Sequence, residues 1–372
     1  MGVLSKVTTL SVVGLAAAAA AAETTVKEEL RAKVCPQSSL EIRYGSHVLP
    51  KTVFYTGKSD GHLRNLTYGP RGEWPDDYQY VFFDNEALDE SMHQLAALLE
   101  DEIDGVYEAF SLLRPWAYKA DLWRYCILWA CGGVYVDSKL ALAEPFDDFV
   151  WNVGFNPDDL DRDVSPQLYS CRDDLASDTM HPKSRVTCLW QGILVAERGS
   201  RALLQTIYFV VNKVRARWYP PYELTKMPWL FLTGPGAIAL ATQASPSWRD
   251  HIKLRCRMTY TPRTDGLTGL QNPHLVGDWN VMPGENVTVY DDNLTHASFI
   301  ADAGLHETQR TNNYGKLFKT HLIYTDEERA QNMTWYLHTR ARLPKAPSHR
   351  QLSGGDVVAA DGDFAPSASQ AS

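Results

Sequence analysis

Apolar and polar positions follow two distinct patterns along the middle of the chain. Short apolar runs bounded by turn residues indicate strands, and apolar positions repeated at helical spacing indicate helices. The strands predicted in this way cover residues 52–56, 78–83, 134–136 and 189–196. The predicted helices cover residues 88–99, 116–130, 200–217 and 237–243. Because strands and helices alternate, the pattern predicts an α/β fold.

The segment from residue 116 to residue 139 carries the strongest chemical signal. Its helix places Asp121 and Arg124 on one face, and such a charged pair is costly to bury without partners. The helix ends at a double glycine, residues 132–133, and a short buried strand then ends on Asp137. We expect Asp137 to face a ligand, because α/β sheets bind ligands at the carboxyl ends of their strands. Lys139 points to the same side as Asp137 if the strand continues.

Two blocks of this segment resemble the signature of a known family. They read Ala120-Asp121-Leu122-Trp123-Arg124-Tyr125 and Gly132-Gly133-Val134-Tyr135-Val136-Asp137-Ser138-Lys139. The blocks resemble the sugar-binding region of DXD-containing glycosyltransferases, the family of the fungal initiating α-1,6-mannosyltransferase. Weaker similarities at residues 49–51, 80–84 and 232–235 extend the resemblance over residues 49–243. The chain departs from the family at Lys139, where the family has a second aspartate.

The resemblance implies a GT-A-type fold, a Rossmann-like mixed sheet flanked by helices in a single catalytic domain. Asp121 and Arg124 would hold hydroxyl groups of a donor sugar. Asp137 would contact the ribose and a divalent ion, Mn²⁺ or Mg²⁺, on the donor diphosphate. The implied catalytic residues are therefore Asp121, Arg124 and Asp137, with Asp137 as the metal ligand. The implied donor-binding set adds Tyr55, Thr56, Lys139 and Gln191.

Two of these positions keep alternatives open. Lys139 could supply positive charge to the diphosphate, neutralise Asp137 in an inactive site, or point away while another acid completes the metal shell. The requirement for Mn²⁺ or Mg²⁺ depends on which of these holds. Gln191 stands where the family often has an asparagine, and it is either a substitute for that residue or an ordinary strand-edge glutamine.

The function that the resemblance implies is retaining transfer of a hexose, with mannose as one candidate sugar. The donor would be a UDP- or GDP-hexose, and the acceptor a glycan on a protein or a lipid. A catalytically silent nucleotide-sugar or glycan-binding module with the same fold is the alternative. The formal net charge of −9 argues against nucleic acid as a partner, because no basic surface is available to neutralise phosphates.

The two ends of the chain differ in composition from the middle. Lys6 precedes an uncharged, alanine-rich stretch at residues 7–22, typical of a signal peptide or a short signal anchor, with an ordinary alanine-rich helix as the third explanation. We divide the chain into a signal or anchor at 1–23, a stem at 24–48, a glycosyltransferase domain at 49–343 and a disordered tail at 344–372. We expect a Golgi or ER luminal protein, either a single-pass type II membrane protein or, after cleavage, a secreted one.

Glycosylation motifs and cysteines support this luminal location. Four sequons, against roughly one or two expected by chance, begin at Asn65, Asn286, Asn293 and Asn332. The six cysteines fit disulfide formation in an oxidising compartment. The spacing suggests the bridges Cys171–Cys188 and Cys35–Cys256, with buried thiols at Cys126 and Cys131.

Overall fold

The structure is a computed structural model, and it describes most of the chain before residue 326. The described residues are 24–36, 40–57, 75–138, 140–142, 146–147, 150, 155, 167–180, 186–243, 251–262, 285–291, 297–302, 314–319 and 321–325. All of them belong to one compact unit, Met1–Asp326. The expected signal or anchor segment and the expected tail lie outside the described residues. Among the helices that are described, none is long and apolar enough to span a membrane.

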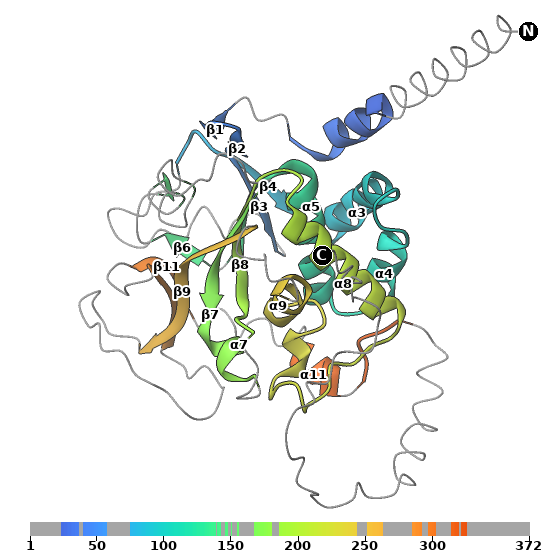
Figure 1. The fold of residues 1–372 in the computed structure, drawn as a ribbon, viewed down its shortest axis with the longest axis vertical. Coiled ribbons are helices and arrows are strands. Elements are labelled where there is room, and N and C mark those ends of the chain that lie inside the picture. Colours follow the sequence, from blue (N-terminus) through green and yellow to red (C-terminus); the bar gives the residue numbers. More distant parts are fainter. Residues whose placement is uncertain are drawn as a thin grey trace, which may run out of the picture. The chain divides into compact units, whose positions relative to one another are not determined.

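Nine of the described strands build one mixed sheet (Figure 1). They are β3 (Thr52–Thr56), β4 (Gln79–Phe83), β5 (Gly133–Val136), β6 (Leu140–Leu142), β7 (Leu168–Asp173), β8 (Leu189–Ala196), β9 (Ile252–Pro262), β10 (Glu285–Asp291) and β11 (Ala297–Asp302). Their order in the sheet is β4-β3-β5-β8-β7-β9-β10-β11-β6. β3 runs parallel to both β4 and β5, whereas β8 runs antiparallel to β5 and β7.

Helices cover one side of the central strands (Figure 1). They include α3 (Asn85–Leu99), α4 (Val106–Leu112), α5 (Trp116–Cys131), α8 (Arg201–Arg215) and α9 (Pro235–Gln243), with the shorter α7 (Asp174–Asp178), α11 (Tyr314–Lys319) and the 3₁₀ helix η1 (Pro228–Leu230). α5 packs against α3 and α8 as well as against the sheet. It is therefore apolar on nearly all sides, as expected of a helix without a solvent face. The four predicted strands and four predicted helices are all present, and the mixed α/β fold is confirmed.

The central strands separate two hydrophobic cores because successive side chains point to opposite faces of a sheet. Phe54 and Tyr135 face the helices and join the core formed with α5. Val53 and Tyr55 face the other way and join the second core, which includes Phe155. This alternation puts Tyr135 on the same side of the sheet as the charged residues of α5.

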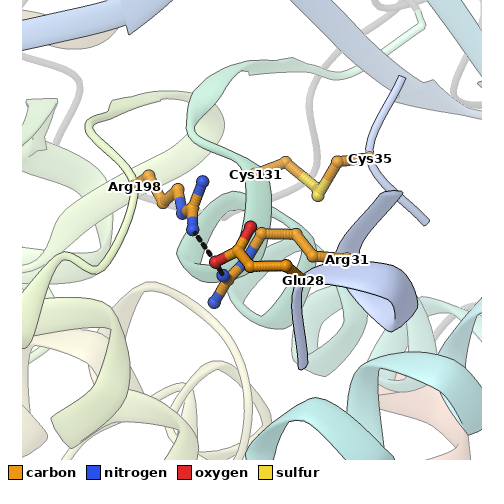
Figure 2. The surroundings of a disulfide bond; sticks show 5 residues. All are labelled: Glu28, Arg31, Cys35, Cys131 and Arg198. Carbon is orange, nitrogen blue, oxygen red and sulfur yellow. Dashed lines mark hydrogen bonds and ion pairs between the residues drawn. A yellow bond between two sulfur atoms is a disulfide. The ribbon is translucent and has the colours of Figure 1, made fainter. Parts of the chain in front are cut away.

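The segment 24–48, expected to be a stem, contains regular structure that contacts the rest of the unit. Residues 24–34 are helical, and the strands β1 (Glu41–Tyr44) and β2 (His47–Pro50) form an antiparallel hairpin. A disulfide joins Cys35 to Cys131 at the end of α5 (Figure 2). Beside it, the Glu28 carboxylate binds the guanidinium groups of both Arg31 and Arg198.

The cysteine pairing differs from the predicted one. Cys35 is bonded to Cys131 rather than to Cys256, because the N-terminal helix brings its Cα to 5.3 Å from that of Cys131. Cys188 is a free, buried thiol in a small apolar cluster and does not bridge to Cys171. Cys171 is disulfide-bonded, and strand pairing places the Cα of Cys256 opposite it. The prediction of a buried thiol is confirmed for Cys126 and is wrong for Cys131.

Candidate functional site

A polar site lies where α5 turns into the sheet. The turn is made by Gly132 and Gly133, whose φ angles of 70° and 102° are strained for any other residue. A Cβ at Gly133 would also lie only 2.7 Å from the Thr52 carbonyl oxygen, so the close approach of β5 to β3 requires glycine. Asp137 directly follows β5, and its backbone N–H donates to the Gly192 carbonyl at 2.8 Å. The parallel strands β3 and β5 thus deliver Thr56 and Asp137 to the same edge of the sheet.

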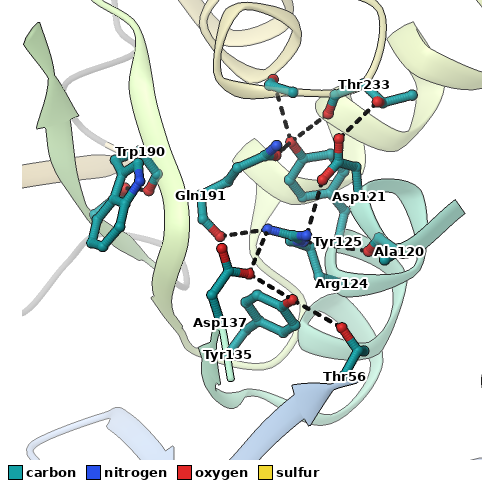
Figure 3. A network of polar contacts seen from close by, with 12 residues as sticks. Thr56, Ala120, Asp121, Arg124, Tyr125, Tyr135, Asp137, Trp190, Gln191 and Thr233 are labelled. Atoms are coloured by element: carbon teal, nitrogen blue, oxygen red, sulfur yellow. Dashed lines mark hydrogen bonds and ion pairs between the residues drawn. The ribbon is translucent and has the colours of Figure 1, made fainter. Parts of the chain in front are cut away.

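Arg124 occupies the centre of this site (Figure 3). Its guanidinium binds the Asp121 carboxylate, with Nη2 2.9 Å from Oδ1, and lies 3.5 Å from Asp137 Oδ1 through Nη1. Nη1 also donates to the Gln191 backbone carbonyl at 2.8 Å. The Tyr135 ring lies 4.3 Å from the guanidinium carbon, a distance at which cation–π attraction operates. The arginine therefore connects α5, β5 and β8.

Asp121 is the buried carboxylate of the site, with 4% of the residue exposed. Its Oδ2 accepts a hydrogen bond from the Thr233 hydroxyl at 2.8 Å. Burial raises the pKa of Asp121 to about 6, although Arg124 and the hydrogen bonds from Thr233 and Gln191 oppose that shift. Burial alone would lower the pKa of Arg124, but Tyr135 and the two aspartates raise it above its ordinary value. Arg124 is thus always charged, whereas Asp121 can change its protonation state near pH 6.

Asp137 is the exposed carboxylate, with 43% of its side chain accessible. Its Oδ1 accepts a hydrogen bond from the Tyr135 hydroxyl at 2.9 Å. Burial raises the pKa of Tyr135 well above its usual range, so the phenol stays protonated and remains a donor. The Thr56 hydroxyl lies 3.3 Å from the same phenol oxygen. The Tyr135 hydroxyl therefore holds one oxygen of Asp137 from the protein side, while part of the carboxylate faces solvent.

The structure brings together most of the residues expected to form the site. Asp121, Arg124, Asp137 and Gln191 form one hydrogen-bonded network, and Thr56 touches it through Tyr135. Among the expected residues that the structure describes, Tyr55 does not belong to this network. Tyr55 is 1% exposed and packs in the core on the other face of the sheet, beside Phe82. Lys139 lies outside the described residues.

Sequence reasoning missed three members of the network, Tyr125, Tyr135 and Thr233. The sequence does indicate that Tyr135 lies near Asp137, because the two residues are two positions apart and so share one side of the strand. Helical spacing likewise indicates that Tyr125 lies near Asp121, because it follows Asp121 by one turn. The contact of both α5 residues with Thr233 had no local signal, since 112 positions separate Thr233 from Asp121.

Comparisons with known proteins place the same segment in a class. Residues 72–154 match the family model described as "Glycosyltransferase sugar-binding region containing DXD motif". The chain thus contains this region, which includes Asp121, Arg124 and Asp137, and the resemblance seen in the sequence is confirmed.

One curated relative is the "Initiation-specific alpha-1,6-mannosyltransferase" of Saccharomyces cerevisiae. It is 29% identical over 121 residues, which cover 30% of this chain and 24% of the relative. The matched stretch therefore spans about a quarter of that protein's length. A solved structure, "PaToxG Glycosyltransferase", aligns with 61% of this chain and 78% of its own at 10% identity and a TM-score of 0.29.

Proposed function

We propose that the protein is a retaining glycosyltransferase that moves a hexose from a UDP- or GDP-sugar to a glycan on a protein or lipid. The observation that carries the proposal is the exposed Asp137 carboxylate, fixed at the strand ends by the buried Asp121–Arg124 pair. Both belong to the matched sugar-binding region. The yeast relative makes mannose the first sugar to test.

The chemistry of hexosyl transfer suits this arrangement. Breaking the bond between the sugar and the diphosphate leaves positive charge on the sugar ring and added negative charge on the departing phosphate. A carboxylate beside the sugar and a cation beside the phosphate stabilise these charges when both are fixed in advance. In the proposal, Asp137 faces the donor, and Arg124 keeps the Asp137 carboxylate in place. The acceptor hydroxyl gives its proton to the departing phosphate, so no separate nucleophile is needed.

The residues of the site fit a divalent ion only in part. The exposed carboxylate of Asp137 offers hard oxygen of the kind that Mn²⁺ or Mg²⁺ binds. Over the described part of the chain, no cluster of three or more histidine, cysteine or acidic side chains could hold a metal. Among the described residues, Asp137 would be the ligand, and phosphate and water oxygens would complete the shell. An ion bound there would supply positive charge to the diphosphate.

A luminal location in the secretory pathway belongs to the same proposal. The Cys35–Cys131 disulfide supports it, because such bonds persist in oxidising compartments. The sequons support it as well, although Asn65, Asn293 and Asn332 lie outside the described residues. The N-terminal stretch would act as an anchor or as a cleaved signal.

Release of nucleoside diphosphate from a panel of UDP- and GDP-hexoses tests the proposal directly. The full chain is assayed with Mn²⁺ and with EDTA, beside the variants Asp137→Asn and Lys139→Asp. We expect turnover of one donor that Asp137→Asn abolishes, and the EDTA arm decides the ion requirement. Nucleotide binding without turnover, with activity gained in Lys139→Asp, would instead support a silent binding module.

A further inference from the structure

Gln191 on β8 is engaged through both its backbone and its side chain, and only 6% of the residue is exposed. Its carbonyl oxygen accepts the hydrogen bond from Arg124. Its side-chain Oε1 accepts a hydrogen bond from the Tyr125 hydroxyl, and a hydrogen bond from its amide is among the influences that lower the pKa of the Asp121 carboxylate. The backbone and the side chain of one residue thus hold both members of the Asp121–Arg124 pair.

The two α5 partners determine the orientation of the Gln191 amide. Asp121 and Tyr125 lie one turn apart on the same face of the helix. An ionised carboxylate can only accept, so the Gln191 NH₂ must point to Asp121, and this leaves Oε1 for the Tyr125 hydroxyl. Figure 3 shows the Gln191 side chain directed toward Tyr125 and Thr233 and away from Asp137.

The turn before α9 encloses the amide. A Cβ placed on Gly234 would lie 3.3 Å from Gln191 Nε2 and 2.8 Å from the Leu230 carbonyl oxygen, so the turn has no room for a side chain there. The Tyr125 hydroxyl also lies 2.7 Å from the Thr233 carbonyl oxygen, which ties this turn to α5. The Gln191 amide is therefore bounded by α5 and by the turn.

We propose that Gln191 is a positioning residue that locks Asp121 and Tyr125 together and thereby fixes Arg124 against Asp137, without contacting the donor. This inference rests on the proposed transferase function. It differs from the donor-binding role that the family resemblance implied for this position. The distinction is chemical: a positioning residue acts through Tyr125, whereas a ligand would act independently of it.

A double-mutant cycle tests the proposal on the full chain with the donor that is turned over. Gln191→Leu keeps the side-chain size and removes both amide contacts, and Tyr125→Phe removes only the hydroxyl. We expect kcat/KM to fall about 30-fold in Gln191→Leu and about 10-fold in Tyr125→Phe, because each leaves buried polar groups unpaired. In the double variant, Tyr125→Phe should cost less than about threefold more, because the contact of its hydroxyl with Gln191 is already lost and only the contact with the Thr233 carbonyl remains to be removed.

A matched control is Gln243→Leu on α9. Gln243 also bridges two segments, since its Oε1 accepts from the Thr187 backbone N–H at 2.8 Å, but it lies outside the network of Gln191. We expect its kcat/KM to stay within about threefold of the starting value. The Kd of the nucleoside diphosphate should likewise change less than about threefold in Gln191→Leu, because the donor does not touch the amide.

Two results would overturn the proposal. One is independence of the two substitutions, with their losses multiplying to about 300-fold. The other is a changed preference among hexoses in Gln191→Leu, as expected of a direct sugar contact. If Gln191→Leu does not fold, Gln191→Asn replaces it in the same cycle, because the shorter amide cannot span both partners.

The absence of turnover in the unsubstituted protein would refute the proposed function and leave the network testable. Urea unfolding of the same four proteins then measures the coupling between Gln191 and Tyr125. We expect a coupling of at least about fivefold in the unfolding equilibrium constant. Independent effects on unfolding would refute the network itself.

Discussion

Arg124 is shared by two carboxylates that lie in opposite surroundings. Asp121 is buried and accepts hydrogen bonds from other parts of the chain, whereas Asp137 is partly exposed and is held mainly through one oxygen. Because a buried charge is costly without partners, the contacts of Asp121 are needed for the site to form. Asp137 needs fewer partners because water solvates it.

The comparison separates two tasks within one ion-pair network. The buried end of the network is the Asp121–Arg124 pair. It fixes the positions of the side chains in the site, since α5, β8 and the turn before α9 all contact this pair. The exposed end offers a carboxylate to a ligand. Substitutions at the buried end should therefore change both stability and activity, and substitutions at the exposed end should change activity alone.

The largest difference is expected between Asp121→Asn and Asp137→Asn. Asp121→Asn replaces one acceptor oxygen with an NH₂ group that faces the donors Arg124 and Thr233, a conflict that a protonated carboxyl avoids, so we expect the free energy of unfolding to fall by about 3 kcal/mol. Asp137→Asn leaves the Asp121–Arg124 pair intact, so its free energy of unfolding should change by less than about 0.5 kcal/mol. Both variants should lose donor turnover. Equal stability of the two variants in urea unfolding would contradict the division of tasks.

The second effect is expected in Arg124→Met. The unpaired Asp121 can take up a proton, so the loss in free energy of unfolding should be smaller than in Asp121→Asn, about 2 kcal/mol at pH 7, and smaller still at pH 5. Turnover should be lost because Asp137 no longer has its internal cation. Arg215→Met is the matched control, because its partners Asp104 and Glu108 are exposed. A loss in Arg124→Met that is the same at both pH values would show that Asp121 does not respond to the missing charge.

The sequence predicted the three charged residues of the network because the patterns that indicate them are local. Asp121 and Arg124 share a helix face, and the double glycine followed by an apolar run placed Asp137 at a strand end. The same local patterns located α5, β5 and β8. Periodicity, turn glycines and a short motif are enough when the interacting residues lie on one element or on two consecutive elements, as they do on α5 and at the end of β5.

The sequence could not predict contacts between distant segments. The contacts of Thr233 and Gln191 with α5 depend on tertiary packing, and the contact from Arg124 to Gln191 uses a backbone carbonyl that any residue would supply. The cysteine pairing failed for the same reason, because Cys35 reaches Cys131 only after the N-terminal helix packs beside α5. The hairpin of β1 and β2 was missed because each strand has only 4 residues, too few for a clear apolar pattern.

The third effect is a pH dependence that comes from Asp121. Its pKa of about 6 in the folded protein lies above the ordinary value of 3.8, so between these values the folded state binds more protons than the unfolded state. Stability should therefore decrease as pH rises from about 4 to about 6, by up to about 3 kcal/mol. The value of kcat/KM should instead increase as pH rises over this range, because only the ionised Asp121 carboxylate holds Arg124 in place.

Urea unfolding and kcat/KM measured from pH 5 to pH 8 would show both trends. Asp137→Asn should keep the dependence of stability on pH, and Asp121→Asn should lose it. An unchanged dependence in Asp121→Asn would assign the titration to another group and remove Asp121 from the explanation.

The smallest effect compares two buried threonines near α9. The Thr233 hydroxyl donates to the Asp121 carboxylate, whereas the Thr242 hydroxyl donates to the Ile238 carbonyl within its own helix. We expect Thr233→Val to lower the free energy of unfolding by about 1 kcal/mol and to raise the pKa of Asp121, because a donor to the charged form is lost. The acid limb of kcat/KM should then move to higher pH. Thr242→Val should leave that limb in place, because a hydroxyl bonded within its own helix contributes little. An acid limb that does not move in Thr233→Val would mean that the contact from the α9 turn does not tune the buried end of the pair.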